Sequence, residues 1–265
     1  MHRRLRGLRG QAMTEFLITF AWGVPLIFAI LQFGMLYRTK ATLNDATFRA
    51  ARAGSVNHAY SVEMKSALVR GMMPDNYRVA PGETPGLMDY EAEMLKHVLA
   101  YQTTHALGAK VEVTSPTQAV FTRLAKRAWV LEPCAGSACP HGGKYREVSS
   151  RNRPYQIPND NLKQRPTTVI NAGGTAMNVQ DANLLSVRTL WCQEMTVPVI
   201  NALVWESLDL FGGLGGPGDW LRCKAYGALH GGYHLPLSAH SVIRMQTPIR
   251  CEGNVTGNRN CKNLK

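Results

Sequence analysis

The chain has 265 residues, of which 45% are hydrophobic and 18% are charged, and 30 Lys and Arg against 18 Asp and Glu give a net charge of +12. That apolar content excludes an intrinsically disordered chain, because disordered segments hold too few hydrophobic residues to form a core. The 24 glycines follow no triplet period, which excludes collagen. The sequence also lacks a repeat of 20–50 residues, the pattern that would indicate a solenoid.

The amino terminus combines a basic leader with a long apolar run. Residues 2–9 carry four arginines and no acid, and residues 16–37 contain no charged side chain. A helix of that length extends about 33 Å, which matches a hydrocarbon core of about 30 Å. Because basic flanks remain in the cytoplasm, we expect a single span whose amino end is cytoplasmic, with everything after Tyr37 exported.

Two common kinds of targeting segment, a cleaved secretory signal and an uncleaved signal-anchor, are alternative interpretations of this apolar run. A cleaved secretory signal has an apolar region of about 7–15 residues that ends in a small-x-small cleavage site. Here the run is longer and ends in Leu36-Tyr37-Arg38-Thr39-Lys40, which argues against that signal. A plain signal-anchor, kept uncleaved in the membrane, remains the second alternative.

The junction between leader and span contains Gly10 and, five residues later, Glu15. A carboxylate at the edge of a span needs a partner or a role, because its insertion is costly. It can also snorkel to interfacial water. The basic leader, Gly10, Glu15 and the apolar helix together resemble the class III signal of type IV prepilins. This resemblance implies that a prepilin peptidase cleaves between Gly10 and Gln11. It also implies that Glu15 sets helix register by neutralising the new amino terminus of a neighbour.

Beyond the span, helix formers and small residues continue through residues 38–53. We therefore expect one helix from Phe16 to Ala53, with a stop at Gly54 and a kink at Pro25 within the membrane. Its carboxyl-terminal part is rich in alanine, which permits other helices to approach closely; a solvated stalk is the alternative. These alanines are Ala41, Ala46, Ala50, Ala51 and Ala53.

The rest of the chain shows mixed periodicities, which predict an α+β domain behind the long helix. We expect helices at 59–72, 87–107 and 117–129, strands at 110–114 and 240–246, irregular chain at 131–175, and β or mixed core segments at 183–193 and 195–200. Residues 195–205 are uncharged, but the run is too short for a second span.

Six cysteines, Cys134, Cys139, Cys192, Cys223, Cys251 and Cys261, all follow the span. An even number in an exported domain indicates disulfides, and six allow 15 pairings. Proximity in the sequence favours Cys134–Cys139 and Cys251–Cys261, which leaves Cys192–Cys223. A zinc site is disfavoured, because it requires closely spaced cysteine pairs and only Cys134 and Cys139 approach that spacing.

Three further patterns favour structural interpretations. Residues 213–218 fit G-x-G-x-x-G, but no strand precedes them and Pro217 interrupts them, so we expect a loop. His230 and His234 flank two glycines, which predicts a surface loop rather than a metal site. Residues 123–165 carry nine Lys and Arg against three acids. We expect a solvated face there, with an acidic partner subunit, an anionic surface or extracellular DNA as alternatives.

The chain resembles TadE-like proteins, minor pilins or pseudopilins of the tight-adherence (Tad) pilus. Residues 9–16 and 33–53 carry this resemblance, and residues 157–162, 179–185 and 244–246 are similar to segments of longer relatives. The major Flp pilin is very short and has Glu-Tyr where this chain has Glu15-Phe16, which favours a minor component. Gln11 also departs from the usual Phe at the mature start of type IV pilins.

The resulting prediction has three segments: a prepilin leader at 1–10, a transmembrane and continuing helix at 11–54, and a disulfide-containing exported α+β domain at 55–265. By resemblance, the protein is a processed minor pilin in the bacterial inner membrane, periplasmic in bulk or extracellular within a pilus, that assembles, primes or tips a Tad-type adhesive pilus. Its implied partners are a prepilin peptidase, other Tad minor pilins, the assembly platform and the membrane, and no specific nucleic acid.

No pattern predicts a catalytic residue, a metal or a cofactor, so we expect no enzymatic activity. The alternatives are a signal-anchored binding module or adhesin outside any pilus, and an exported enzyme. No recognisable nucleophile and base support the latter.

Overall fold

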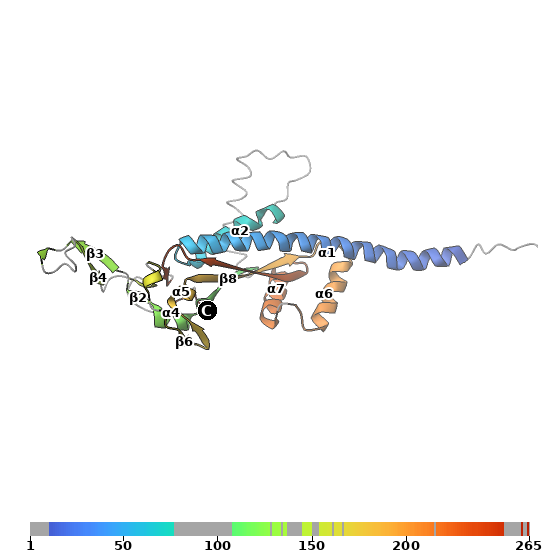
Figure 1. Ribbon diagram of the computed structural model, residues 1–265. Helices are drawn as coiled ribbons and strands as arrows, with labels where there is room; N and C mark the ends of the chain where they lie inside the picture. Colours follow the sequence, from blue (N-terminus) through green and yellow to red (C-terminus); the bar gives the residue numbers. More distant parts are fainter. Residues whose placement is uncertain are drawn as a thin grey trace, which may run out of the picture. The chain divides into compact units, whose positions relative to one another are not determined.

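A computed structural model describes residues 11–76, 108–127, 129–133, 135–136, 145–149, 154–160, 162–165, 167–214, 216–251, 261 and 264. The helices are α1 (Gln11–Val56), α2 (Ser61–Asn76), α4 (Gln118–Leu124), α5 (Val179–Ala182), α6 (Ile200–Leu210), α7 (Pro217–His230) and the 3-10 helix η3 (Leu162–Gln164) (Figure 1). The leader at 1–10 and the helix expected at 87–107 lie outside the described residues.

The strands form four small sheets. They are β1 (Ala109–Ser115), β2 (Lys126–Arg127), β3 (Trp129–Pro133), β4 (Tyr145–Ser149), β5 (Tyr155–Ile157), β6 (Ile170–Ala172), β7 (Thr175–Met177), β8 (Leu184–Glu194), β9 (His234–Arg244) and β10 (Ile249–Arg250). The sheet orders are β1-β8-β9, β10-β5-β2, β3-β4 and β6-β7. The long helix and this mixed domain confirm the predicted α+β class.

The chain divides into two compact units. One contains α1 as far as Ala41 together with Cys192–Leu237, and the other contains Thr42–Trp191 together with Ser238–Lys265. The first unit therefore holds the apolar part of α1 with α6 and α7. The second holds the carboxyl-terminal part of α1, α2 and most of the strands.

Helix α1 extends past the glycine that we expected to end it. The helix continues through Gly54 to Val56. A Cβ added at Gly54 would lie 2.7 Å from Met64 Sδ, so this glycine permits close packing against α2. The prediction of a stop at Gly54 was wrong, because a glycine with ordinary helical φ can serve close approach as well as termination.

The carboxyl end of α1 is capped by a distant segment. The Ser55 carbonyl accepts hydrogen bonds from the backbone N–H groups of Gln246 and Thr247, each at 3.0 Å. After the helix, His58 and Ala59 adopt left-handed φ values of 57° and 61° and reverse the chain into α2. The last carbonyl groups of a helix have no acceptor role within it, and at Ser55 this hydrogen-bonding capacity is filled by residues 246–247.

The second half of α1 is part of the core of its own chain. Leu43, Ala46, Thr47, Ala50 and Ala51 are fully buried. The Thr47 hydroxyl lies 2.6 Å from the Thr189 hydroxyl on β8. The alternative of a solvated stalk was therefore wrong for this segment, because its small side chains pack against other elements of the same chain.

Helices α1 and α2 make a backbone-level contact where Gly71 meets Ala46. A Cβ added at Gly71 would lie 2.6 Å from Ala46 Cβ and 2.7 Å from Ala46 Cα. Both partners of this contact are short, and neither can swing aside as a long side chain could. Any side chain at position 71 must therefore push the two helices apart.

We expect Gly71→Ala to destabilise the protein by about 1–3 kcal/mol, the range typical of overpacked sites. Gly218→Ala in α7 is the matched control, because a Cβ there meets no atom within 4 Å. It should be neutral or slightly stabilising. The free energy of unfolding of the full chain in detergent micelles, from denaturant titration, checks both. Equal effects of the two substitutions would contradict the close contact.

Strand β1 confirms the strand expected at 110–114 and pairs antiparallel with β8, with Val113 opposite Val187. The β or mixed segment expected at 183–193 is a strand, β8, from Leu184 to Glu194. The strand expected at 240–246 is confirmed as far as Arg244, although β9 begins earlier, at His234. Ser241 and Ile243 are half-buried and Met245 is buried, which agrees with the predicted face.

Several predictions for shorter elements were wrong. The helix expected at 117–129 ends at Leu124, since the chain then becomes extended and residues 126–127 pair with β5. The segment 131–175 contains short paired strands, which are too brief to show a period in the sequence. Residues 195–199 form no strand, and α6 begins at Ile200.

Three segments of the chain meet at Asn183, which is fully buried. Its side-chain N–H donates to the Pro158 carbonyl at 2.9 Å and to the Val179 carbonyl at 2.8 Å. The backbone carbonyl of Asn183 accepts a hydrogen bond from the Met245 backbone N–H at 2.8 Å. These contacts join the segments 157–162, 179–185 and 244–246, so Asn183 holds three parts of the domain together.

Candidate membrane-anchoring and assembly region

The residues predicted for processing and assembly lie at the amino end of α1. Gly10 is outside the described residues, and Gln11 is the first residue of the helix. Glu15 follows in the second turn and is exposed. Pro25 lies inside the helix, which continues without a break on both sides. Cleavage at Gly10, the role of Glu15 and the kink at Pro25 remain predictions.

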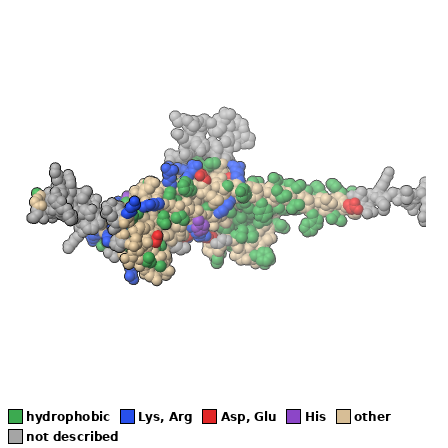
Figure 2. Space-filling view, viewed as in Figure 1, with side chains coloured by type: hydrophobic (Ala, Val, Ile, Leu, Met, Phe, Trp, Pro, Cys, Tyr) green, Lys and Arg blue, Asp and Glu red, His purple; other side chains and the backbone are tan. Residues whose placement is uncertain are grey.

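The amino-terminal half of α1 presents apolar side chains to its surroundings. In the described part of the chain, one helix is long and apolar enough to cross a membrane, and it is α1. The large exposed side chains include Phe16, Leu17, Ile18, Phe20, Trp22, Leu26, Ile27 and Ile30. Figure 2 shows hydrophobic side chains gathered along this half of the helix. Such a surface fits lipid or other apolar helices.

A buried amide marks the position at which the folded unit begins to cover α1. Gln32 is 2% exposed, and its side-chain oxygen accepts from the Val197 backbone N–H at 3.0 Å. One turn later, Thr196 Oγ1 lies 3.6 Å from Met35 Sδ. Residues 196–197, just before α6, are therefore fixed to the last third of the apolar run.

Sequence reasoning missed this attachment. An amide within an otherwise apolar run was the available signal, because a polar group in such a setting needs a hydrogen-bond partner. Nothing in the sequence identified residue 197 as that partner.

An aromatic core holds α6 and α7 against this part of α1. Its buried members are Leu36, Met195, Trp205, Trp220 and Leu235. The Trp205 and Trp220 rings stack with centroids 4.3 Å apart. Burial of this cluster fixes the α6–α7 pair beside α1 within one compact unit (Figure 1).

Asp209 joins the two helices of this pair. Its carboxylate accepts from Trp220 Nε1 and from Lys224 Nζ, each at 2.8 Å. The hydrogen bond from Lys224, followed by that from Trp220, lowers the pKa of Asp209. The negative charge of Asp209 is therefore held by a cation of α7.

In the glycine-rich segment expected to be a loop, residues 213, 214 and 216 have no regular structure, as predicted, but residues 217 and 218 begin a helix. Gly213 has a φ of +82°, and a Cβ there would lie 2.3 Å from Trp220 Cγ. Pro217 is the first residue of α7. Proline suits that position, because the first helical N–H groups have no partner within the helix. The absence of a preceding strand agrees with the prediction.

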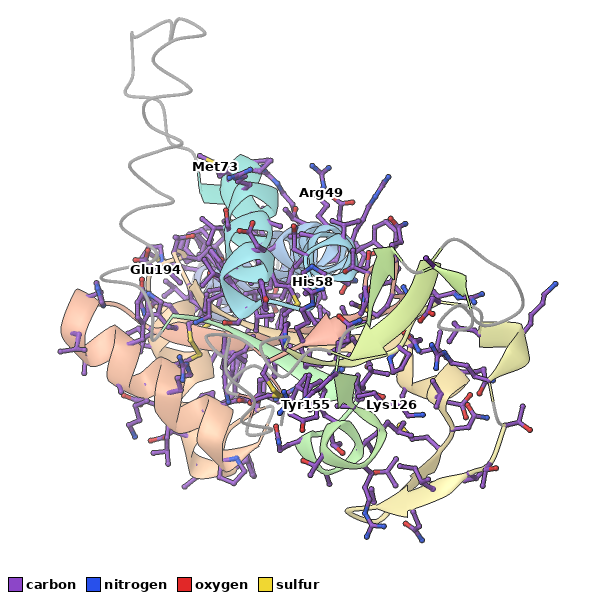
Figure 3. The ribbon with its side chains drawn as sticks, turned by 90° about the vertical axis from the view of Figure 1, so that its left-hand side faces the viewer. Arg49, His58, Met73, Lys126, Tyr155 and Glu194 are labelled. Atoms are coloured by element: carbon purple, nitrogen blue, oxygen red, sulfur yellow. A yellow bond between two sulfur atoms is a disulfide. The ribbon has the colours of Figure 1, made fainter. Side chains whose placement is uncertain are left out.

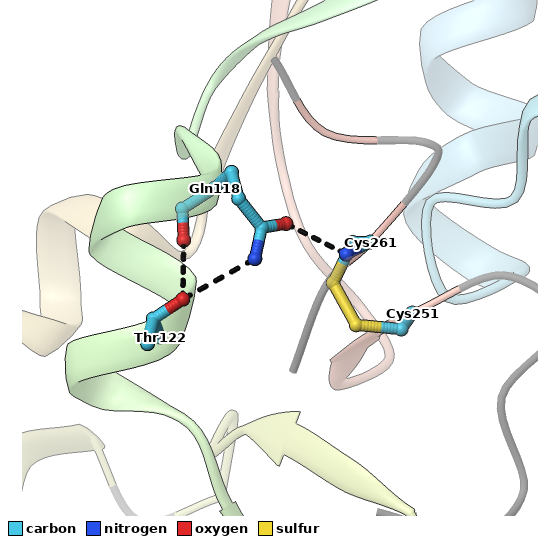
Figure 4. Close-up of a disulfide and its surroundings, with 4 residues drawn as sticks. All are labelled: Gln118, Thr122, Cys251 and Cys261. Atoms are coloured by element: carbon cyan, nitrogen blue, oxygen red, sulfur yellow. Dashed lines mark hydrogen bonds between the residues drawn. A yellow bond between two sulfur atoms is a disulfide. The ribbon is translucent and has the colours of Figure 1, made fainter. Parts of the chain in front are cut away.

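Two disulfides are present among the described residues. Cys192 is bonded to Cys223 with a Cα–Cα distance of 5.3 Å, and Cys251 to Cys261 with 4.6 Å. The pair 251–261 is one that sequence proximity favoured, and the pair 192–223 is the one that it left over; Cys134 and Cys139 lie outside the described residues. Figure 4 shows that the Cys261 N–H donates to Gln118 Oε1 at 2.8 Å, which connects the carboxyl terminus to α4.

Of the two histidines expected in a surface loop, His230 is exposed where α7 meets the loop at 231–233, whereas His234 is buried at the start of β9, and both rings contact Tyr226. The His230 ring stacks on Tyr226 at 4.3 Å, and the His234 ring meets it edge-on at 4.9 Å. His234 is 6% exposed, and this burial lowers the pKa of its imidazole. The hydrogen bond to the Gly232 carbonyl and the charge of Glu194 act in the opposite direction and raise that pKa, but burial has the larger effect. The described residues contain no group of three or more potential metal ligands.

The basic segment 123–165 is described only in part. Arg123, Lys126 and Lys163 are exposed, which agrees with a solvated face. Lys126 lies in β2 close to Tyr155 in Figure 3, and the Arg127 guanidinium lies 5.2 Å from the Tyr155 ring centre. These contacts identify no ligand for the segment.

Comparison with known families gives one finding. A model of the TadE-like protein family matches residues 10–52, which confirms the predicted resemblance for the amino-terminal segment. The match begins at Gly10 and ends near the carboxyl end of α1. No curated protein and no solved structure matches the chain.

Proposed function

We propose that this protein is a minor pilin of a Tad-type pilus, anchored in the inner membrane by α1 and processed by a prepilin peptidase after Gly10. The observation that carries the proposal is the match of residues 10–52 to TadE-like proteins, on a helix whose amino half exposes apolar side chains. Residues 1–10 then stay cytoplasmic, residues 11–54 include the span, and the domain at 55–265 is exported. The role is structural, in assembling, priming or tipping the filament.

The two halves of α1 differ in burial: the carboxyl-terminal half packs within its own chain, and the amino-terminal half is exposed. Residues 43–51 contribute five fully buried side chains to the fold of the same chain. Residues 13–31 keep most of their apolar side chains exposed. Contacts with helices of other pilins are therefore assigned to the amino-terminal half. The partners are other Tad minor pilins and the assembly platform.

Glu15 has a defined task in this proposal. Cleavage after Gly10 creates a positive amino terminus at Gln11, in the same apolar environment as the Glu15 carboxylate of a neighbouring subunit. Pairing these two charges sets the register between helices, since an unpaired charge in such surroundings costs about 3–5 kcal/mol. Its exposed position on α1 leaves the carboxylate accessible to a neighbour.

We expect Glu15→Ala to leave processing and membrane insertion intact but to lower co-purification with other pilins by about tenfold or more, since 1.4 kcal/mol already corresponds to tenfold. Glu63→Ala, at an exposed acid of α2, is the matched control and should have no effect. Quantitative mass spectrometry of the sheared pilus fraction and of the membrane complex measures both. Unchanged recovery with Glu15→Ala, and no pilin partners in the wild type, would instead favour a signal-anchored binding module.

A further inference from the structure

Helix α6 exposes large apolar side chains on the side opposite its buried Trp205. Leu203 is 63% exposed and Leu210 is 82% exposed, and Val199, which precedes the helix at a φ of 69°, is also exposed. The spacing of seven residues places Leu203 and Leu210 on one side of α6, with the exposed Glu206 and Ser207 between them. Trp205 lies on the buried side. Phe211, directly after the helix, extends the apolar surface.

The depth of α6 relative to a membrane follows from its attachment to α1. The part of the apolar run before Gln32, residues 16–31, makes a helix of about 24 Å, which is about 6 Å shorter than a hydrocarbon core. A full span must therefore include the turn that contains Gln32 and Met35. Because Val197 and Thr196 are bonded to these two residues, the start of α6 lies at the same depth.

We propose that α6 lies in the interface of the exported leaflet, with Val199, Leu203 and Leu210 turned toward lipid. Interfacial helices sink about 5–10 Å into the boundary between headgroups and acyl chains, which matches the missing 6 Å. This inference rests on the membrane anchoring in the proposed function. The occupant of this side of α6 is the bilayer, because the contacts of Val197 with Gln32 and of Thr196 with Met35 hold the start of the helix at the depth where the span ends.

The polar groups of α6 are compatible with this position. Ser207 Oγ donates to the Leu203 carbonyl at 2.7 Å, so its hydroxyl is satisfied within the helix. Asp209 is held by Lys224 and Trp220. Glu206 is exposed on the same side as Leu203 and Leu210, and its side chain can reach headgroup water by snorkelling. Helix α6 contains no Lys or Arg, so its contact with lipid does not depend on anionic headgroups.

Lipid photo-crosslinking of the full chain tests this placement. A diazirine amino acid replaces Leu203 in one variant, Ile27 of α1 in a second, and Val242 of β9, which is 62% exposed, in a third. Each variant is reconstituted in vesicles of phosphatidylethanolamine and phosphatidylglycerol, and in vesicles of phosphatidylcholine alone. Lipid adducts are measured by mass spectrometry after irradiation. Formation of the Cys192–Cys223 disulfide, checked by peptide mapping, verifies folding.

We expect lipid adducts at positions 203 and 27 in both vesicles, several-fold above those at position 242. Adducts at 27 with none above the Val242 level at 203 would overturn the interfacial placement and leave the anchoring intact. Crosslinks from 203 to protein instead of lipid would also overturn it. The absence of adducts at position 27 would contradict the anchoring itself.

Discussion

Replacing Gly10 with leucine is expected to abolish processing, so that the full-length chain accumulates in the membrane with residues 1–10 attached. In the proposed function the peptidase cleaves after Gly10, and we expect a branched side chain at that position to block access to the bond before Gln11. Gly7→Leu is the matched control within the same leader and should be processed normally. The intact mass of the membrane-bound protein, with and without prepilin peptidase, distinguishes the two forms.

The same experiment separates the proposal from its nearest rival. An uncleaved signal-anchor would show one mass in the wild type and in both variants. Normal processing of Gly10→Leu would show that the bond after Gly10 is not the one cleaved. Either result would remove the basis for pairing between Glu15 and a new amino terminus.

Removing the Cys192–Cys223 disulfide is expected to cost about 3–4 kcal/mol of stability. The Cys192→Ala, Cys223→Ala double variant opens a loop with a sequence separation of 31, and the cost follows from the freedom that the unfolded chain regains. The matched double variant at Cys251 and Cys261 opens a separation of 10 and should lose about 1 kcal/mol less. Both pairs are buried, so the alanines create similar packing losses.

The measurement is the free energy of unfolding of the full chain in detergent micelles, with non-reducing peptide mapping to establish the pairing. Mapping that joined Cys192 or Cys223 to another cysteine would contradict the structure. A smaller loss for the pair at 192 and 223 than for the pair at 251 and 261 would contradict the loop-closure explanation.

The long elements of this fold could be predicted, because they carry a periodic or compositional signal over many residues. The apolar run and the helix formers after it predicted α1, and alternation predicted β1 and part of β9. The end of α1 could not be predicted, since Gly54 serves contact with Met64 and the actual cap comes from residues 246–247. A short strand such as β5 depends on pairing with distant segments, here β2 and β10.

In the candidate region, too, local sequence patterns could be predicted and contacts between distant residues could not. Gly10 and Glu15 form a local pattern that one sequence displays directly, and the family match begins at the same glycine. The contact between Gln32 and Val197 joins positions 165 residues apart and exists only in the folded chain. The uncharged run at 195–205 is visible in the sequence, but which side chains of α6 are exposed depends on the side that packs against Trp220.

The amino-terminal sequence of the native protein, isolated from membranes of cells with an active prepilin peptidase, tests the central claim most directly. The proposed function predicts a mature chain that begins at Gln11, with Glu15 as its fifth residue. A chain that begins at Met1 would contradict processing after Gly10 and, with it, the assignment as a minor pilin.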